Sequence, residues 1–107
     1  MERELLKGHL DMLLLAIIAR TPDHGYAIAS RLHNQSDGQF DLAEGTLYPA
    51  LHRLEANGWA VSNWQKADGR RRRVYQITET GQHMLAEQIS IWDGLQTGIR
   101  LVLRGAI

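Results

Sequence analysis

The sequence predicts a mainly α-helical domain with one small β-hairpin. Apolar residues recur at helical spacing in several stretches, and one pair of short alternating segments flanks an Asp-Gly turn signal. The length of 107 residues is that of a single domain, with 44% hydrophobic and 22% charged residues. A chain of this composition is expected to fold around one small core.

The first two helices are predicted over residues 10–20 and 25–35. The first is apolar on nearly every face and is followed by a proline turn, which indicates a buried helix with a sharp end. In the second, Ile28 and Leu32 share one apolar face, opposite polar residues. Residues 40–42 are then too few for more than one short extended segment.

A third helix is predicted over residues 43–57, ended by Gly58 as glycine commonly ends helices. Pro49 conflicts with this helix, because an interior proline removes a backbone hydrogen bond and clashes with the preceding turn. Two versions remain open. The regular helix begins near Thr46, so that the proline falls in the first turn, or it begins at Ala43 and bends at the proline.

A two-stranded hairpin is predicted after the third helix. Residues 59–65 and 73–77 alternate and carry aromatic and branched side chains, and residues 66–69 between them hold the Asp-Gly signal. Trp59 and Trp64 are expected to pack within this hairpin.

One long amphipathic helix is predicted over residues 79–104, with Thr78 as its N-cap. The spacing leaves this helix little to pack on within its own chain, so we expect it to pair with the same helix of a second copy. Residues 1–78 and residues 79–107 are therefore expected to form a core domain and a dimerisation helix within one compact unit. The expected interface residues are Leu85, Ile89, Trp92, Leu95, Ile99 and Val102.

Several classes of protein are disfavoured by what the sequence lacks. There is no cysteine, and the five histidines show no paired-ligand spacing, so neither disulfides nor a metal site is expected. We find no catalytic or phosphate-cradling motif, and we expect no cofactor and no enzymatic activity. The longest apolar run, residues 12–19, is too short to span a membrane, and no signal peptide is evident, so a cytoplasmic protein is expected.

The balanced net charge hides a local asymmetry. Twelve basic and twelve acidic residues cancel, but residues 45–80 hold six basic against three acidic residues, a net +3. Four consecutive arginines, residues 70–73, lie within this stretch. The run is either a solvated charged surface or a site for nucleic-acid phosphates.

Three helices followed by a hairpin with a basic tip is the arrangement of a winged helix-turn-helix, whose third helix enters the major groove while the hairpin, or wing, follows the backbone. Short motifs occur at residues 7–11, 24–26, 45–55, 58–59, 69–72 and 78–81. In the order and spacing of these motifs, the sequence resembles the PadR family of bacterial transcriptional regulators, and by length it resembles the branch with a single C-terminal helix. The resemblance implies a homodimer that binds palindromic operator DNA and usually represses.

The candidate DNA-binding residues lie on the third helix and at the hairpin. Leucines and an alanine of the helix share one side, which should face the core, while the opposite side offers hydroxyl, imidazole and guanidinium groups for phosphates or base edges. Tyr48 could instead pack its ring, and Thr46 could be only an N-cap. In the hairpin, alternate arginines should point to opposite faces, so two or three phosphate contacts per subunit are expected. The candidates are Gly45, Thr46, Tyr48, Pro49, His52, Arg53, Lys66, Arg70, Arg71 and Arg72.

Trp92 has two readings. It is either plain interface core or a platform on which a planar aromatic effector stacks near a twofold axis, as in drug-responsive members of the family that the sequence resembles.

A second function also stays open for the whole chain. It is a winged-helix module for protein association, in which the arginines only solvate a strand and no DNA is bound.

Overall fold

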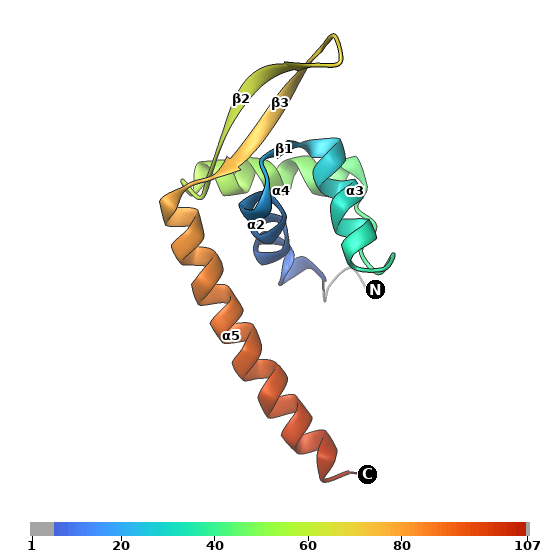
Figure 1. The fold of residues 1–107 in the computed structure, drawn as a ribbon. Coiled ribbons are helices and arrows are strands. Elements are labelled where there is room, and N and C mark those ends of the chain that lie inside the picture. The colour runs from blue at the N-terminus through green and yellow to red at the C-terminus, as the bar shows by residue number, and fades with distance from the viewer. Residues whose placement is uncertain (1–5, 107) are drawn as a thin grey trace.

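The computed structural model describes residues 6–106, in the order α2, β1, α3, α4, β2, β3, α5 (Figure 1). Three of the helices form the core: α2 (Leu10–Arg20), α3 (Gly25–Gln35) and α4 (Glu44–Ala56). The predicted first and second helices are confirmed to the residue. The core side chains are Leu10, Leu14, Leu15, Ile17, Ile18, Ile28, Leu32, Leu47, Ala50, Leu51, Leu54, Ala60 and Tyr75.

The sheet has three strands in the order β1-β3-β2, all antiparallel neighbours. The third strand, β1 (Asp23–His24), pairs with β3 and was predicted only as a turn, because two residues carry no alternation. The extended segment predicted at residues 40–42 is not a strand. Phe40 instead packs its ring against the core, and its backbone N–H donates to Ser36 Oγ at 3.0 Å.

Both hairpin strands are longer than predicted, with β2 covering Ala60–Ala67 and β3 covering Arg70–Ile77. The turn consists of Asp68 and Gly69 alone, at φ 53° and 75°, the geometry of a two-residue type I′ turn. The arginines therefore lie in β3 itself, and Arg70, not Arg73, opens the strand. The prediction was wrong because the outer half of the hairpin is polar throughout and shows no alternation.

The helix α4 begins at Glu44, with Ala43 at its N-cap position, so Pro49 lies inside the helix beyond its first turn. The early start is therefore the correct one of the two versions. Pro49 has no N–H to offer the Gly45 carbonyl one turn earlier, and both residues are exposed.

The long helix α5 (Glu79–Arg104) has the predicted bounds. Thr78 Oγ1 caps it by accepting from the Gly81 N–H at 3.0 Å, and the same hydroxyl donates to the Gly58 carbonyl at 2.6 Å. Met84 and Leu85 pack against the core, so the expectation that α5 has little to pack on in its own chain is wrong for its first turns. The C-terminal part extends away from the core (Figure 1). None of the helices within residues 6–106 is long and apolar enough to cross a membrane.

Candidate nucleic-acid interface

The helix α4 has two chemically different sides. Leu47, Ala50, Leu51 and Leu54 are buried, as the helical spacing predicted. The opposite side is exposed over most of its length and carries Gly45, Tyr48, Pro49, His52 and Arg53, while Thr46 is half-buried. A helix whose apolar side holds it rigidly against a core while its polar side faces solvent is suited to entering a DNA groove.

Tyr48 packs its ring against the start of α3. A methyl group added at Gly25 would lie 2.7 Å from Tyr48 Cε1 and 2.8 Å from its hydroxyl oxygen, so any side chain there would displace the ring from this position. Tyr48 remains 38% exposed. The ring is therefore both packed and accessible, which combines the two alternatives that the sequence left open.

Tyr26, next to Gly25 in the first turn of α3, was not among the predicted site residues. Its side chain is 74% exposed, the most exposed aromatic residue described, and it lines a hollow of about 410 Å³ between α3 and α4. Asp41 and Glu44 line the same hollow. An aromatic residue at helical spacing is equally typical of a core, so the sequence alone did not indicate that Tyr26 is exposed near the start of α4.

Arg53 does not point freely into solvent. Its Nη2 and Nε donate to Asp11 Oδ1 at 2.6 and 3.1 Å, and Nε also lies 3.3 Å from Oδ2. These hydrogen bonds raise the pKa of the Arg53 guanidinium above its usual value, against a smaller opposite effect of burial. The pair joins the first turn of α2 to the last turn of α4 and fixes the two helices relative to each other.

Lys7 is a second residue that the sequence did not single out. It lines a hollow of about 500 Å³ together with Gly45, Thr46, Pro49 and Arg53 of α4. An exposed ammonium group beside the exposed side of α4 extends the positive charge toward the N-terminal segment. A single lysine outside any charge run gives no signal in the sequence.

The register of the hairpin divides its cationic residues between two faces. Lys66 pairs with Arg71 and Trp64 with Arg73, on one face, whereas Arg70 and Arg72 lie on the other. This is the alternation that the sequence predicted for the arginines. The four guanidinium groups therefore cannot all reach one DNA strand.

The face of Trp64 is a basic and aromatic cluster. The guanidinium carbons of Arg71 and Arg73 lie over the Trp64 ring, 5.4 and 5.6 Å from its centre. Trp64 thus packs against side chains within the hairpin, as expected, but it remains 56% exposed. Trp59, which was also expected to pack within the hairpin, lies just before β2 and packs against the core.

Arg73 also ties the hairpin to α4. Its Nε donates to Ser62 Oγ at 2.7 Å, and Ser62 in turn donates to Glu55 Oε2 at 2.7 Å. Arg73 Nη2 lies 3.9 Å from the same Glu55 oxygen. The end of α4 and the base of the wing are thereby held together, which fixes the angle between them.

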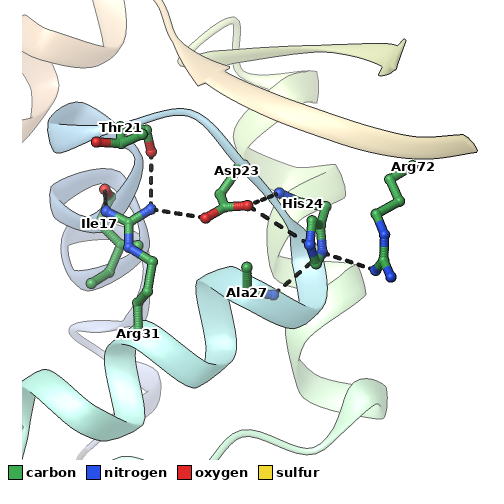
Figure 2. Close-up of polar contacts among 7 residues, drawn as sticks. All are labelled: Ile17, Thr21, Asp23, His24, Ala27, Arg31 and Arg72. Carbon is green, nitrogen blue, oxygen red and sulfur yellow. Dashed lines mark hydrogen bonds and ion pairs between the residues drawn. The ribbon is translucent and has the colours of Figure 1, made fainter. Parts of the chain in front are cut away.

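Figure 2 shows a polar network that connects the other face of the wing to α3. His24 Nδ1 accepts from the Ala27 N–H at 3.4 Å and so caps α3. Arg72 Nη1 lies 3.5 Å from the same nitrogen. Asp23 accepts the His24 N–H at 2.9 Å and pairs with Arg31 at 3.5 Å. Arg72 is thus turned toward α3 and is half-buried.

The outer part of α5 exposes an apolar stripe. Leu95, Ile99 and Val102, all among the predicted interface residues, are exposed and line a shallow groove with Leu103, Gly94 and Gly98. Ile89 is also exposed, whereas Leu85 packs against its own core. The predicted set therefore contains one residue that serves the fold of the single chain.

Trp92 lies where α5 leaves the core. Its ring meets His9 edge-on, with centres 5.3 Å apart, and it is 37% exposed. The ring lines an apolar hollow of about 240 Å³ together with Leu6, His9, Met12, Leu13 and Phe40.

Residues 14–87 match the family model described as the transcriptional regulator PadR-like family. Among similar proteins, the Mycobacterium tuberculosis protein named transcriptional regulator Rv3488 is 38% identical over 85 residues, which cover 79% of this chain and 77% of that protein. A PadR family transcriptional regulator from Eggerthella lenta has a crystal structure with a TM-score of 0.81 at 33% identity, covering 94% of this chain and 86% of the other. A PadR-like regulator from Bacillus cereus gives a TM-score of 0.83 at 27% identity, covering 94% and 96% of the two chains.

Proposed function

The chain belongs to the PadR-like family of transcriptional regulators, and from this premise we propose that it is a repressor that binds palindromic operator DNA as a homodimer. The family is one of regulators and not of enzymes, as the sequence predicted. The main support for the proposal is that the chain combines a helix with an exposed polar side, α4, and a projecting hairpin that contains Lys66 and the four arginines.

The exposed side of α4 is assigned to the major groove. Gly45 lets the backbone approach the DNA, the hydroxyls of Thr46 and Tyr48 face phosphates, and His52 reads base edges. Pro49 lies on the same side. Arg53 would have to leave Asp11 to reach a base, so we assign it to orienting α4. The carboxylate of Glu44, in the first turn, repels phosphate, so this side chain should face base edges while Thr46 faces the backbone.

The wing is assigned to the phosphate backbone. Lys66, Arg70, Arg71 and Arg72 supply the charge, with two or three contacts per subunit, because Arg72 is turned toward His24. Two subunits neutralising roughly six phosphates give a slope of log K against log salt near −5.

The proposal of a homodimer rests on α5. Leu95, Ile99 and Val102 form an exposed apolar stripe that a second α5 would cover, and a twofold axis would then place two α4 helices about one DNA turn, ~34 Å, apart. Trp92, which lines the hollow, lies three residues before Leu95 of this stripe on α5, and we assign the hollow to a small aromatic effector whose binding changes the pairing of the two helices and releases the operator. The other outcome is that Trp92 only packs in the interface.

The function is tested by titrating the protein with random duplex and with the DNA upstream of its own gene, over a salt series. We expect binding that weakens steeply with salt, and tighter binding to the upstream DNA. Replacing Arg70 and Arg71 together by alanine should weaken all duplexes about equally, whereas His52→Ala should alter base preference. Arg20→Ala, at an exposed arginine ending α2, is the control. No binding to any duplex at low salt would favour the module for protein association.

A further inference from the structure

The face of the hairpin that holds Trp64 contains two features that the fold alone does not explain. Trp64 is 56% exposed, although tryptophan is among the side chains whose burial stabilises a protein most. Lys66 and Arg71 are direct cross-strand neighbours, and like charges in that position are destabilising. Neither residue is in any of the ion pairs found among the described side chains. Two facing cations without a carboxylate suit an anion between them.

The contacts of the four arginines separate their roles. Arg73 is held by Ser62 and Glu55, and Arg72 is directed toward His24. Arg71 is an exposed side chain whose guanidinium lies over the indole of Trp64. Arg70 lies on the opposite face of the hairpin. Of the four, Arg71 alone is both held in place by an aromatic ring and directly paired with a second cation.

An aromatic ring under a guanidinium reduces the entropy that the arginine loses on binding. A free arginine gives up most of its rotamer freedom when it engages a phosphate, whereas one already resting on a ring has lost part of it beforehand. A guanidinium lying over a ring keeps its N–H groups, which lie in its plane, available for two hydrogen bonds to a phosphate. The ring therefore orders the arginine side chain before binding and leaves its N–H donors free for the phosphate.

We propose that Lys66 and Arg71 form a clamp for a single backbone phosphate of duplex DNA, and that Trp64 is its positioning residue. The proposal rests on the proposed function and adds a defined site to it. Cβ atoms of directly paired residues lie about 5 Å apart, so the flexible ammonium and the planar guanidinium can approach one phosphate from two sides. Trp64 acts through Arg71 and does not itself touch the DNA.

The test is a double-mutant cycle on duplex affinity, measured by fluorescence anisotropy of labelled upstream DNA at several salt concentrations. Arg71→Ala should weaken binding, and Arg71→Ala combined with Lys66→Ala should make the salt slope less steep by about two for a dimer, one phosphate per subunit. Trp64→Ala should weaken binding by about two- to fivefold per subunit, the range expected for an exposed cation–π contact. In the Arg71→Ala background, Trp64→Ala should have no further effect.

Two further variants distinguish the effect of the aromatic ring from that of an apolar side chain of substantial size, and thermal unfolding checks that the hairpin is intact. Trp64→Phe keeps an aromatic face and should bind within about twofold of wild type, whereas Trp64→Leu keeps an apolar side chain but should bind like Trp64→Ala. Thermal unfolding of each variant reports whether the hairpin and core survive. Arg70→Ala, on the other face, should leave the effect of Trp64→Ala undiminished.

The outcomes distinguish this clamp from the function on which it rests. Trp64→Ala that weakens binding equally with and without Arg71 would mean that the ring contacts DNA itself and would overturn the positioning role. Wild-type affinity in Trp64→Ala or in Lys66→Ala would overturn the clamp while leaving DNA binding intact. Absence of salt-dependent binding by the wild-type protein would overturn both proposals.

Discussion

Arg53 and Asp11 lie 42 positions apart in the chain, and their two-pronged ion pair joins the last turn of α4 to the first turn of α2. This pair helps to hold α4 in its orientation relative to the core. The orientation matters because α4 is the helix that we assign to the groove. The pair also gives the Arg53 guanidinium, a predicted DNA-binding group, a partner within its own chain.

The first prediction concerns this pair. Asp11→Ala and Arg53→Ala should each lower the free energy of unfolding by about 0.5–1 kcal/mol, the usual range for a partly exposed ion pair, and the double variant should lose little more. Urea unfolding of the four proteins measures the coupling. Additive losses would mean that the two residues act independently. A change in base preference on Arg53→Ala alone would show that Arg53 leaves Asp11 to read DNA.

The second prediction concerns the apolar stripe of α5. Ile99→Asp should give monomers in analytical ultracentrifugation, because it places a charge where two helices would meet. Thr97→Asp, two residues earlier and therefore on the other side of the helix, is the matched control and should stay dimeric. Leu85→Asp should instead destabilise the single chain, since Leu85 packs against its own core. A dimer that survives Ile99→Asp would refute pairing through this stripe.

The third prediction compares two glycines of α5. A methyl group at Gly81 would collide with the backbone carbonyl of Trp59, whereas nothing lies within 4 Å of one at Gly94. Gly81→Ala should therefore lower stability by about 3 kcal/mol, because the contact is with backbone, and neither α5 nor the segment that enters β2 can move easily. Gly94→Ala should raise it by up to about 1 kcal/mol through helix propensity. Thermal unfolding measures both, and equal shifts would contradict the close contact at Gly81.

The fourth prediction concerns alkaline pH. Burial raises the pKa of the Tyr75 phenol, the negative charge of Glu55 raises it further, and Arg73 partly opposes them. The associated stability is fully present below about pH 10, the usual pKa of tyrosine, and is lost as the pH rises through the higher pKa of the folded state. Tyr75→Phe should show a shallower decline in urea midpoint above pH 10. Tyr26→Phe, at an exposed ring, is the control and should follow wild type.

The helices were predictable because each carries several independent local signals. In α4, the leucines at helical spacing, the glycine after its end and the exposed polar side agree, and only Pro49 left its start undecided. For α5, the Thr78 cap and the long apolar repeat gave both ends correctly. The outer hairpin was misjudged because strand signals rest on alternation of apolar and polar residues, and residues 65–72 contain almost no apolar side chains.

The site was less predictable than the fold because it depends on contacts between distant segments. The identity of the exposed residues on α4 followed from the helical wheel, but the partner of Arg53 lies on another helix. Tyr26 and Lys7 became candidates only when α3 and the N-terminal segment were placed beside α4. The exposure of Trp64 follows from a turn only two residues long, which carries β2 outward beyond the core.

The junction between β3 and α5 consists of Thr78 alone, and its hydroxyl is bonded to both Gly81 and Gly58. Because the connection is so short, α5 moves as a rigid rod about Thr78. The helix is about 39 Å long, so a 5° rotation at its N-terminal end displaces its C-terminal end by roughly 3 Å. In a twofold assembly in which the two α5 helices are paired, the same rotation would move each core domain relative to α5 and so change the separation of the two α4 helices. Spacer length between operator half-sites, varied one base pair at a time, would then report how the two C-terminal helices cross.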